Sequence, residues 1–288
     1  MTDVAIDPVQ EEAFVTGQRR AHWPDILARL EAAGAAVAAS PGFTADVAYG
    51  PHPRQRYDLL PARGAARGIV AYFHPGYWQM RDRTIGRCVL PVFAALGFDA
   101  VTVGYPLAPE ASVGEITEAA RAVVPALLAE ARRRHGRALP LVAAGHSAGA
   151  HLAVELAATD WAGRGLAPSP IAAVVALSGV YDLEPLIATT LNAALRLDEA
   201  SARAASPIHR VGALGGPTLF AVGAAETAAF RDQNTRMCDA WRAAGHAATT
   251  FESDGDDHFS LIERLMTPRS PLADAVGDLL GGLPATLG

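Results

Sequence analysis

Residues 139–158 read LPLVAAGHSAGAHLAVELAA, and this stretch decides the fold. Its first residues, Leu139–Ala144, are apolar and predict a buried strand. The residues after Gly149 favour a helix that continues to about Ala158. The pentapeptide Gly145-His146-Ser147-Ala148-Gly149 therefore lies at a strand-to-helix turn.

A G-x-S-x-G pentapeptide in this context is typical of a nucleophilic serine on a sharp, strained turn. The turn would lift the Ser147 hydroxyl clear of the sheet, and a side chain at Gly145 or Gly149 would crowd the neighbouring strand and helix. The backbone N–H of Ala148 would face a developing oxyanion at the positive end of the helix. An ordinary turn with a helix-capping serine is the alternative interpretation.

The rest of the chain alternates strands with helices. Short apolar runs predict further strands at 57–60, 68–73, 99–105, 171–177, 218–222 and 249–252. Helices are expected at 83–96, at 113–134 with a bend at Pro125, and at 260–266. Because the strands are almost continuously apolar, they need helices on both faces, which predicts an α/β domain with a mainly parallel sheet. Catalytic groups should gather at the carboxyl ends of its strands.

Two segments are set apart from this pattern. Residues 1–45 are alanine-rich in part and predict a mainly helical N-terminal lead-in, so that the α/β domain spans 46–288. Residues 183–211 are too few for a large lid and predict a small helical cap over an open site.

The loop His74-Pro75-Gly76-Tyr77-Trp78 follows an early strand, where such a sheet supplies the second half of an oxyanion hole. The N–H groups of Gly76 and Tyr77 are expected to face a substrate carbonyl oxygen together with that of Ala148. Pro75 has no N–H to donate, and it stiffens the loop. A plain proline–glycine turn among core aromatic residues is the alternative.

Candidates for the acid and the base follow late strands, in the chain order serine, acid, histidine. Glu226 lies just past one such strand, and His258 lies in the last loop before a helix. His258 would take the proton from Ser147, while Glu226 would orient the imidazole and stabilise its cation. Asp182 also follows a strand and is the competing acid, which we interpret as a turn-stabilising residue.

The acidic run Asp254-Gly255-Asp256-Asp257 beside His258 raises the question of a metal site. Its carboxylates lack the spacing of a calcium loop, and no second histidine lies nearby in the sequence. We therefore expect neither a metal nor another cofactor.

Composition narrows the range of partners. The net charge is −6 and no dense basic stripe occurs, which argues against nucleic acid. The longest aliphatic stretch, 171–177, is too short to span a bilayer, so no membrane partner is expected. The first residues are acidic and do not resemble a secretory signal, which favours a cytoplasmic protein acting on a small-molecule substrate. The two cysteines, Cys88 and Cys238, are expected as buried thiols, and a homodimer is left open.

The chain resembles the kynurenine formamidase (arylformamidase) branch of the α/β-hydrolases, near the hormone-sensitive-lipase-like esterases. The resemblance covers roughly residues 45–265. The matching stretches are Tyr49–Leu59, His74–Trp78, Tyr105–Glu110, Gly145–Leu152, Ser178–Leu183, Val222–Gln233 and His258–Phe259.

This resemblance implies the α/β-hydrolase fold and the hydrolysis of N-formyl-L-kynurenine to L-kynurenine and formate, a step of tryptophan catabolism that needs no metal. The family's triad and oxyanion positions fall on Ser147, Glu226 and His258 and on Gly76, Tyr77 and Ala148. The chain departs from the family at Pro75, where the family usually has glycine.

The resemblance leaves two other functions open. A carboxylesterase acting on small acyl or aryl esters would use the same tetrahedral intermediate, and a ligand-binding protein could be built on a hydrolase scaffold without activity. An aromatic wall suited to an aryl amine or aryl ester is expected, although such residues also serve as packing. The side chains assigned to the substrate pocket are His74, Trp78, His146 and Tyr181.

Overall fold

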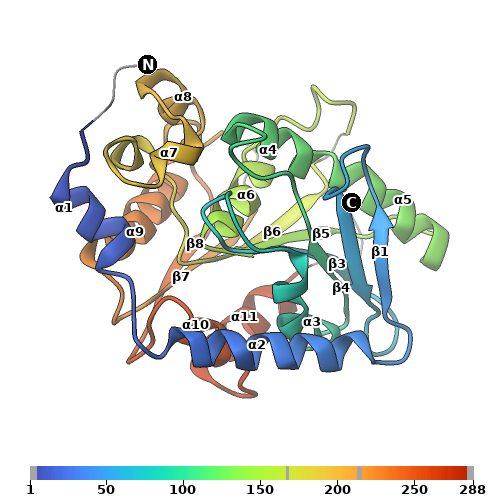
Figure 1. Ribbon diagram of the computed structural model, residues 1–288. Helices are drawn as coiled ribbons and strands as arrows, with labels where there is room; N and C mark the ends of the chain where they lie inside the picture. Colours follow the sequence, from blue (N-terminus) through green and yellow to red (C-terminus); the bar gives the residue numbers. More distant parts are fainter. Residues whose placement is uncertain (1–4, 167–168, 213–215, 284–288) are drawn as a thin grey trace.

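A central sheet of eight strands lies between two layers of helices (Figure 1). The structure is a computed structural model that describes residues 5–166, 169–212 and 216–283. The strands are β1 (Thr44–Ala48), β2 (Arg56–Leu60), β3 (Gly68–Phe73), β4 (Phe98–Val103), β5 (Leu141–His146), β6 (Ile171–Leu177), β7 (Thr218–Gly223) and β8 (Ala248–Ser253).

The strand order is β1-β2-β4-β3-β5-β6-β7-β8. Strands β3 to β8 run parallel to one another, whereas β1 pairs antiparallel with β2 and β2 antiparallel with β4. Every residue of β3, β4, β5 and β7 is buried. Strands of this kind are stable only when helices cover both faces of the sheet.

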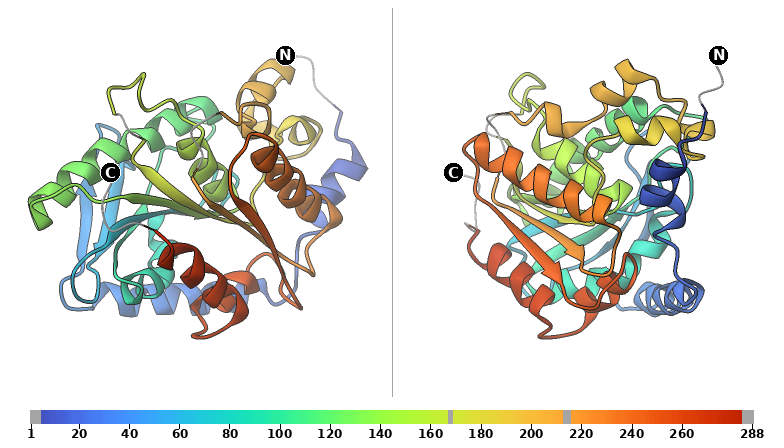
Figure 2. Two further views of the ribbon diagram at one scale, coloured as in Figure 1. Left: turned by 180° about the vertical axis from the view of Figure 1, so that it is seen from behind. Right: turned by 90° about the vertical axis from the view of Figure 1, so that its left-hand side faces the viewer.

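Two helical layers provide that cover, as the views in Figure 2 show. One layer consists of α4 (Val113–Arg121), α5 (Val123–His135), α6 (Ala148–Ala157) and α9 (Ala228–Ala243). The other consists of α2 (Trp23–Ala38), the 3-10 helix η2 (Arg83–Val89), α3 (Leu90–Ala95), α10 (Ser260–Met266) and α11 (Pro271–Gly281). Each layer packs against its own face of the sheet, so the protein has two hydrophobic clusters.

Short helices lie above the carboxyl ends of the strands (Figure 1). They are α1 (Pro8–Glu11) and the π-helix η1 (Glu12–Thr16) near the N-terminus, and η3 (Glu184–Ala188), α7 (Asn192–Leu195), α8 (Glu199–Ala204) and η4 (Pro207–His209). The last four occupy the segment predicted as a cap. The Asp7 N–H donates to the Ala188 carbonyl over 2.9 Å, so the N-terminal helices and the cap segment lie side by side.

The structure differs from the sequence-based expectation at three elements. Strand β1 was not predicted, because its residues are mostly exposed and form no apolar run. The expected helix 113–134 is two helices that break at Ala122, and Pro125 lies in the first turn of α5. A proline is tolerated there because the first N–H groups of a helix have no intrahelical acceptor. Helix α11 was also not predicted.

Three other expectations can be compared directly with the structure. The two cysteines are free and buried, as predicted. The α/β architecture with a mainly parallel sheet is confirmed. None of the helices in the described part of the chain has the length and hydrophobicity that crossing a bilayer requires.

Candidate active site

The loops after β3, β5, β6, β7 and β8 meet at one edge of the sheet. The strand ends are level there, since Phe73 lies opposite Gly145 and His146 lies opposite Leu177. The direction in which the chain adds strands changes at β3, because β4 lies on one side of β3 and β5 lies on the other. A reversal of this kind leaves a crevice at the carboxyl ends of the strands, where ligands of α/β sheets bind. Ser147 follows β5 at this point.

Ser147 sits on a strained turn. Its φ and ψ angles are 57° and −122°, a conformation that costs a non-glycine residue energy. A Cβ atom on Gly145 would lie 2.2 Å from the Gly149 carbonyl oxygen, and one on Gly149 would lie 2.0 Å from the Phe73 carbonyl oxygen. The Ser147 side chain makes no capping hydrogen bond to α6, which excludes the helix-capping alternative.

The His258 imidazole is hydrogen-bonded to the Glu226 carboxylate. The His258 Nδ1–H donates to Glu226 Oε2 over 2.7 Å, which assigns the proton to Nδ1 and leaves Nε2 free to act as a base. Ser147 and His258 line the same cavity, of about 220 Å³. The structure therefore joins the predicted base to the predicted acid and places the predicted nucleophile on the same cavity as the base.

The Glu226 carboxylate is buried and receives three further hydrogen bonds. Its Oε1 accepts from the Gly223 N–H over 2.9 Å and from the Ser178 hydroxyl. Its Oε2 accepts from Gln18 Nε2 over 3.1 Å. These donors fix the carboxylate against rotation, so that Oε2 stays aimed at His258.

Gln18 and Ser178 are functional candidates that sequence reasoning did not identify. Ser178 begins the loop after β6, and its position beside a strand end was the available signal. Gln18 reaches Glu226 across 208 positions of the chain, and no local pattern marks it.

Aromatic rings surround the His258 imidazole. The distances between ring centroids are 4.4 Å to His146, 5.0 Å to Phe230, 5.3 Å to Phe259 and 6.0 Å to Trp23. Such rings restrict the motion of the imidazole and keep water from its bond to Glu226.

The predicted oxyanion loop offers free donors. Within the described part of the chain, the N–H groups of Gly76 and Tyr77 have no acceptor, and both residues line the cavity. Ala148 is the first residue of α6, so its N–H has no intrahelical acceptor. Gly76 has a φ of +126°, and a Cβ atom there would lie 2.2 Å from the Met80 carbonyl oxygen. Only glycine fits this turn.

The N-terminal segment, which we define as residues 7–23, connects the loops of the site. Its hydrogen bonds run from Tyr77 Oη to Phe14 O, from Thr227 Oγ1 to Ala13 O (2.7 Å) and from Arg20 Nη2 to Ala225 O (2.7 Å). The segment thus joins the oxyanion loop to the loop that carries Glu226.

The four side chains predicted for the substrate pocket do not line the cavity. His74, Trp78, His146 and Tyr181 are all fully buried, and none of them is among the residues that line it. The His74 ring stacks on Tyr105 with centroids 4.1 Å apart, and burial lowers the pKa of His74 to about 4. In the tight 74–78 loop, successive side chains cannot all face the cavity, which accounts for His74 and Trp78.

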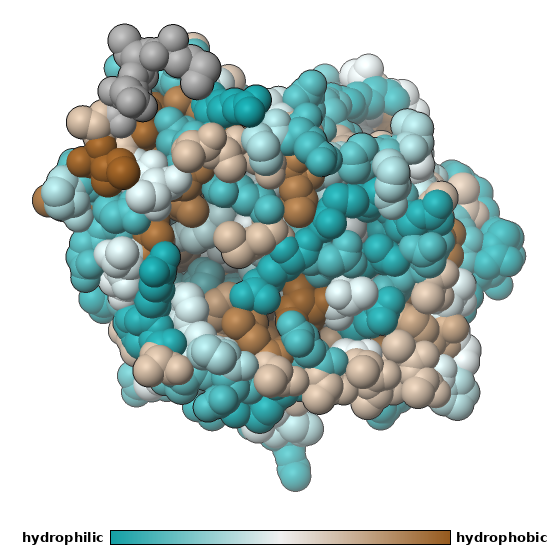
Figure 3. Space-filling model, in the orientation of Figure 1, coloured by the Kyte–Doolittle hydropathy of each residue, from teal (hydrophilic) through white to brown (hydrophobic). Residues whose placement is uncertain are grey.

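The wall of the cavity comes instead from four parts of the chain. Its large apolar members are Phe14, Trp23, Tyr77, Met80, Leu191 and Phe259. They belong to the N-terminal segment, the oxyanion loop, the cap segment and the loop after His258. Figure 3 shows hydrophobic residues in and around a hollow near the middle of the face that carries these loops.

The alternatives for acid and metal can be compared with the structure. Asp182 accepts from Arg236 Nη2 over 3.0 Å and from the Glu184 N–H over 3.2 Å, so it stabilises a turn and does not contact His258. In the acidic loop, Asp257 Oδ1 accepts the N–H groups of Phe259 and Ser260, each over 3.0 Å. Among the residues that the structure describes, one cluster has ligand atoms close enough together to hold a metal ion, and it consists of Asp182, Glu184 and His209.

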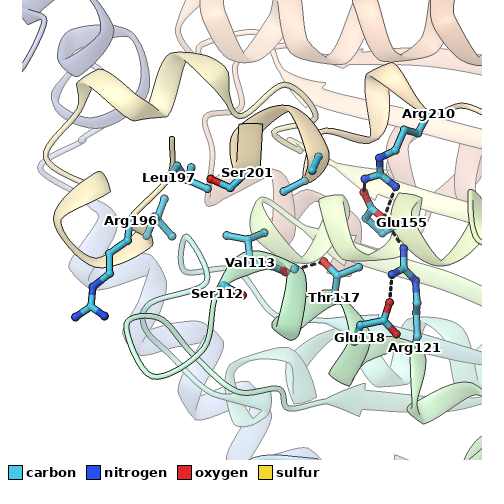
Figure 4. A pocket seen from close by; sticks show the side chains of 14 residues that line it. Ser112, Val113, Thr117, Glu118, Arg121, Glu155, Arg196, Leu197, Ser201 and Arg210 are labelled. Carbon is cyan, nitrogen blue, oxygen red and sulfur yellow. Dashed lines mark hydrogen bonds and ion pairs between the residues drawn. The ribbon is translucent and has the colours of Figure 1, made fainter. Parts of the chain in front are cut away.

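A second hollow, of about 400 Å³, lies between α4, α6 and the cap segment (Figure 4). Its buried carboxylate, Glu155, accepts from Arg121 Nη2 over 2.8 Å and is also paired with Arg210. Figure 4 shows the two guanidinium groups on either side of this carboxylate, and Arg196 pointing away from the hollow. Arg121 also pairs with Glu118 over 2.6 Å, so that two carboxylates balance the two guanidinium groups. The Glu155–Arg210 bridge attaches the end of the cap segment to α6.

With this fold and this arrangement of side chains, the chain belongs to the α/β-hydrolase fold family, whose model matches residues 70–261, and it is a hydrolase. Kynurenine formamidase of Danio rerio is 29% identical over 243 residues, which are 82% of this chain and 81% of that protein. The resemblance stated from the sequence is confirmed.

Solved structures support the same family. A protein of Silicibacter sp. TM1040 described as a candidate thioesterase has a TM-score of 0.79 at 27% identity, over 92% of this chain and 97% of that one. A hyperthermophilic esterase of the archaeon Pyrobaculum calidifontis has a TM-score of 0.69 at 19% identity, over 96% and 97% of the two chains. At that identity the esterase supports the fold alone.

Proposed function

We propose that the protein removes a formyl group from an aryl amide through an acyl-enzyme, with N-formyl-L-kynurenine as its substrate. The observation that carries this proposal is the hydrogen bond from His258 to Glu226 beside a cavity that Ser147 also lines. Similarity to a kynurenine formamidase supports the choice of substrate.

The reaction begins when His258 Nε2 takes the hydroxyl proton of Ser147 and the oxygen attacks the formyl carbon. The negative charge on the carbonyl oxygen is met by the N–H groups of Gly76, Tyr77 and Ala148. His258 returns the proton to the aryl amine, which leaves a formyl ester on Ser147. Water activated by the same imidazole then releases formate.

The cavity favours a small acyl group on an aromatic amine. Its volume of about 220 Å³ is below the range common for drug-sized ligands, so it suits a compact substrate with a single ring. The rings of Tyr77, Phe259 and Trp23 give that ring aromatic neighbours. These features support an aryl formamide over a long-chain ester.

Parallel kinetics on N-formyl-L-kynurenine and p-nitrophenyl acetate test the substrate. We expect a higher kcat/KM for the formamide, with Ser147→Ala abolishing both activities. A much higher kcat/KM for the ester would favour the competing carboxylesterase.

The non-catalytic alternative has its own test. A ligand-binding protein without activity would leave Ser147 unreactive toward a fluorophosphonate probe, whereas the proposed enzyme reacts with it. The cytoplasmic location and the homodimer stay predictions.

A further inference from the structure

The candidate active-site cavity is lined by two arginines, while the nearest carboxylate, Glu226, lies behind His258 and is hydrogen-bonded to it. Arg19 and Arg81 both line it, and no aspartate or glutamate does among the residues that the structure describes. In an otherwise largely apolar cavity, two guanidinium groups favour an anionic ligand group.

Arg81 is half-buried and lacks an ionic partner. Within the described residues, its side chain makes no ion pair, and its guanidinium lies 5.4 Å from the centre of the Phe259 ring. Glu31, on α2, raises its pKa only at longer range, and burial lowers that pKa overall. A half-buried charge without a partner is costly, so a ligand carboxylate would gain more there than at an exposed arginine.

The neighbouring arginines are paired, which sets Arg81 apart. Arg54 pairs with Asp82 over 3.3 Å, and Arg83 pairs with the buried Asp58 over 3.1 Å. Among these three arginines in the described part of the chain, Arg81 alone has no ion pair, and it is the one that lines the cavity.

The backbone holds Arg81 in place. Its φ is +71°, in the left-handed region that residues other than glycine rarely adopt. Its carbonyl oxygen accepts from Arg54 Nη2, and Arg54 Nε also donates to the Tyr105 carbonyl over 3.0 Å. These contacts fix the strained residue beside the loop that carries His258.

We propose that Arg81, with Arg19 at the rim, binds a carboxylate on the leaving group of the substrate. The substrates are then aryl formamides or aryl esters that bear a carboxylate. The position on the leaving group rests on the proposed function, because a formyl group has no place for a second substituent. A planar guanidinium binds a carboxylate through two parallel hydrogen bonds, which gives orientation as well as affinity.

Two matched substrate pairs test this inference. One pair is 3-formamidobenzoate and 3-formamidobenzamide, and the other is 3-acetoxybenzoate and 3-acetoxybenzamide. We expect the wild-type enzyme to prefer the carboxylate member of each pair. Arg81→Gln should lower kcat/KM for the carboxylates by about 10- to 100-fold and for the neutral amides by less than about 2-fold.

Two further variants complete the design. Arg19→Gln should lower kcat/KM for the carboxylates by about 3-fold, because this side chain is exposed. Arg63→Gln removes an exposed arginine outside the cavity and should leave both rates unchanged. Labelling of Ser147 by a fluorophosphonate at the wild-type rate shows that Arg81→Gln has kept the site intact.

The outcomes separate this inference from the proposed function. Equal loss on both members of a pair in Arg81→Gln, or no wild-type preference for the carboxylates, overturns the carboxylate site and leaves the hydrolase in place. Discrimination among the esters with inert formamides supports the carboxylate site and overturns the formamidase assignment.

Discussion

Glu226 and His258 show how much of the site can be predicted at the scale of single residues. Their positions after late strands identified them, because chemistry in this fold is confined to the strand ends. The donors that hold Glu226 were not predicted, since Gln18 lies in a turn 208 positions away in the sequence and its role depends on tertiary packing. The pocket side chains were wrongly placed for a related reason. Sequence order in the 74–78 loop does not reveal that Trp78 turns into the core.

Replacing Gln18 tests whether its hydrogen bond to the Glu226 carboxylate contributes to catalysis. Gln18→Met keeps the volume and removes the donor, so we expect kcat/KM to fall by about 10-fold, as one charge-assisted hydrogen bond is lost. Gln79→Met is the control, because Gln79 Nε2 donates to the Leu191 carbonyl and touches no triad residue. Equal losses in the two variants would show that Gln18 acts only through packing.

At the scale of elements, apolar strands were predictable and exposed ones were not. Strands β3 and β6 occupy the residues that their apolar runs predicted, because complete burial imposes a continuous hydrophobic pattern. Strand β1 is exposed along most of its length and leaves no such pattern. The N-terminal segment was expected to be helical, but its packing on the Glu226 loop depends on contacts with residues some 200 positions away.

The attachment of the cap segment to α6 gives a prediction at this scale. Arg210→Met breaks one of the two pairs of the buried Glu155, so we expect the free energy of unfolding to fall by about 1–2 kcal/mol in urea titrations. This figure is reduced because the Arg210 side chain is 39% exposed. Arg203→Met breaks a pair between exposed residues on the same segment and should cost less than about 0.5 kcal/mol. A reversed order of the two values would contradict the role given to the Glu155 bridge.

At the scale of the whole molecule, the sheet brings together loops that lie far apart in the chain and buries several histidines behind them. Burial lowers the pKa values of His74, His146 and His151, and for His74 the value falls from 6.5 to about 4. All three are therefore neutral in the folded protein at mildly acidic pH, where they take up protons in the unfolded chain.

Stability should consequently fall as the pH drops from about 6.5 to 4. Above pH 6.5 His74 is neutral in both states and contributes nothing. Below it only the unfolded chain binds the proton, which lowers the free energy of unfolding by about 3 kcal/mol by pH 4. Urea titrations across this range should show a shallower decline for His74→Asn than for the wild type. Identical slopes would mean that His74 is protonated in the folded protein.

The central claim is that Ser147 is activated by His258. Its most direct test is the rate of fluorophosphonate labelling, with the modified peptide identified by mass spectrometry. We expect wild-type protein to be labelled on Ser147 and Ser147→Ala to stay unlabelled. The labelling rate of His258→Ala should be lower than the wild-type rate by a factor of about 1,000 or more. Labelling of His258→Ala at the wild-type rate, or label found on another residue, would contradict the account.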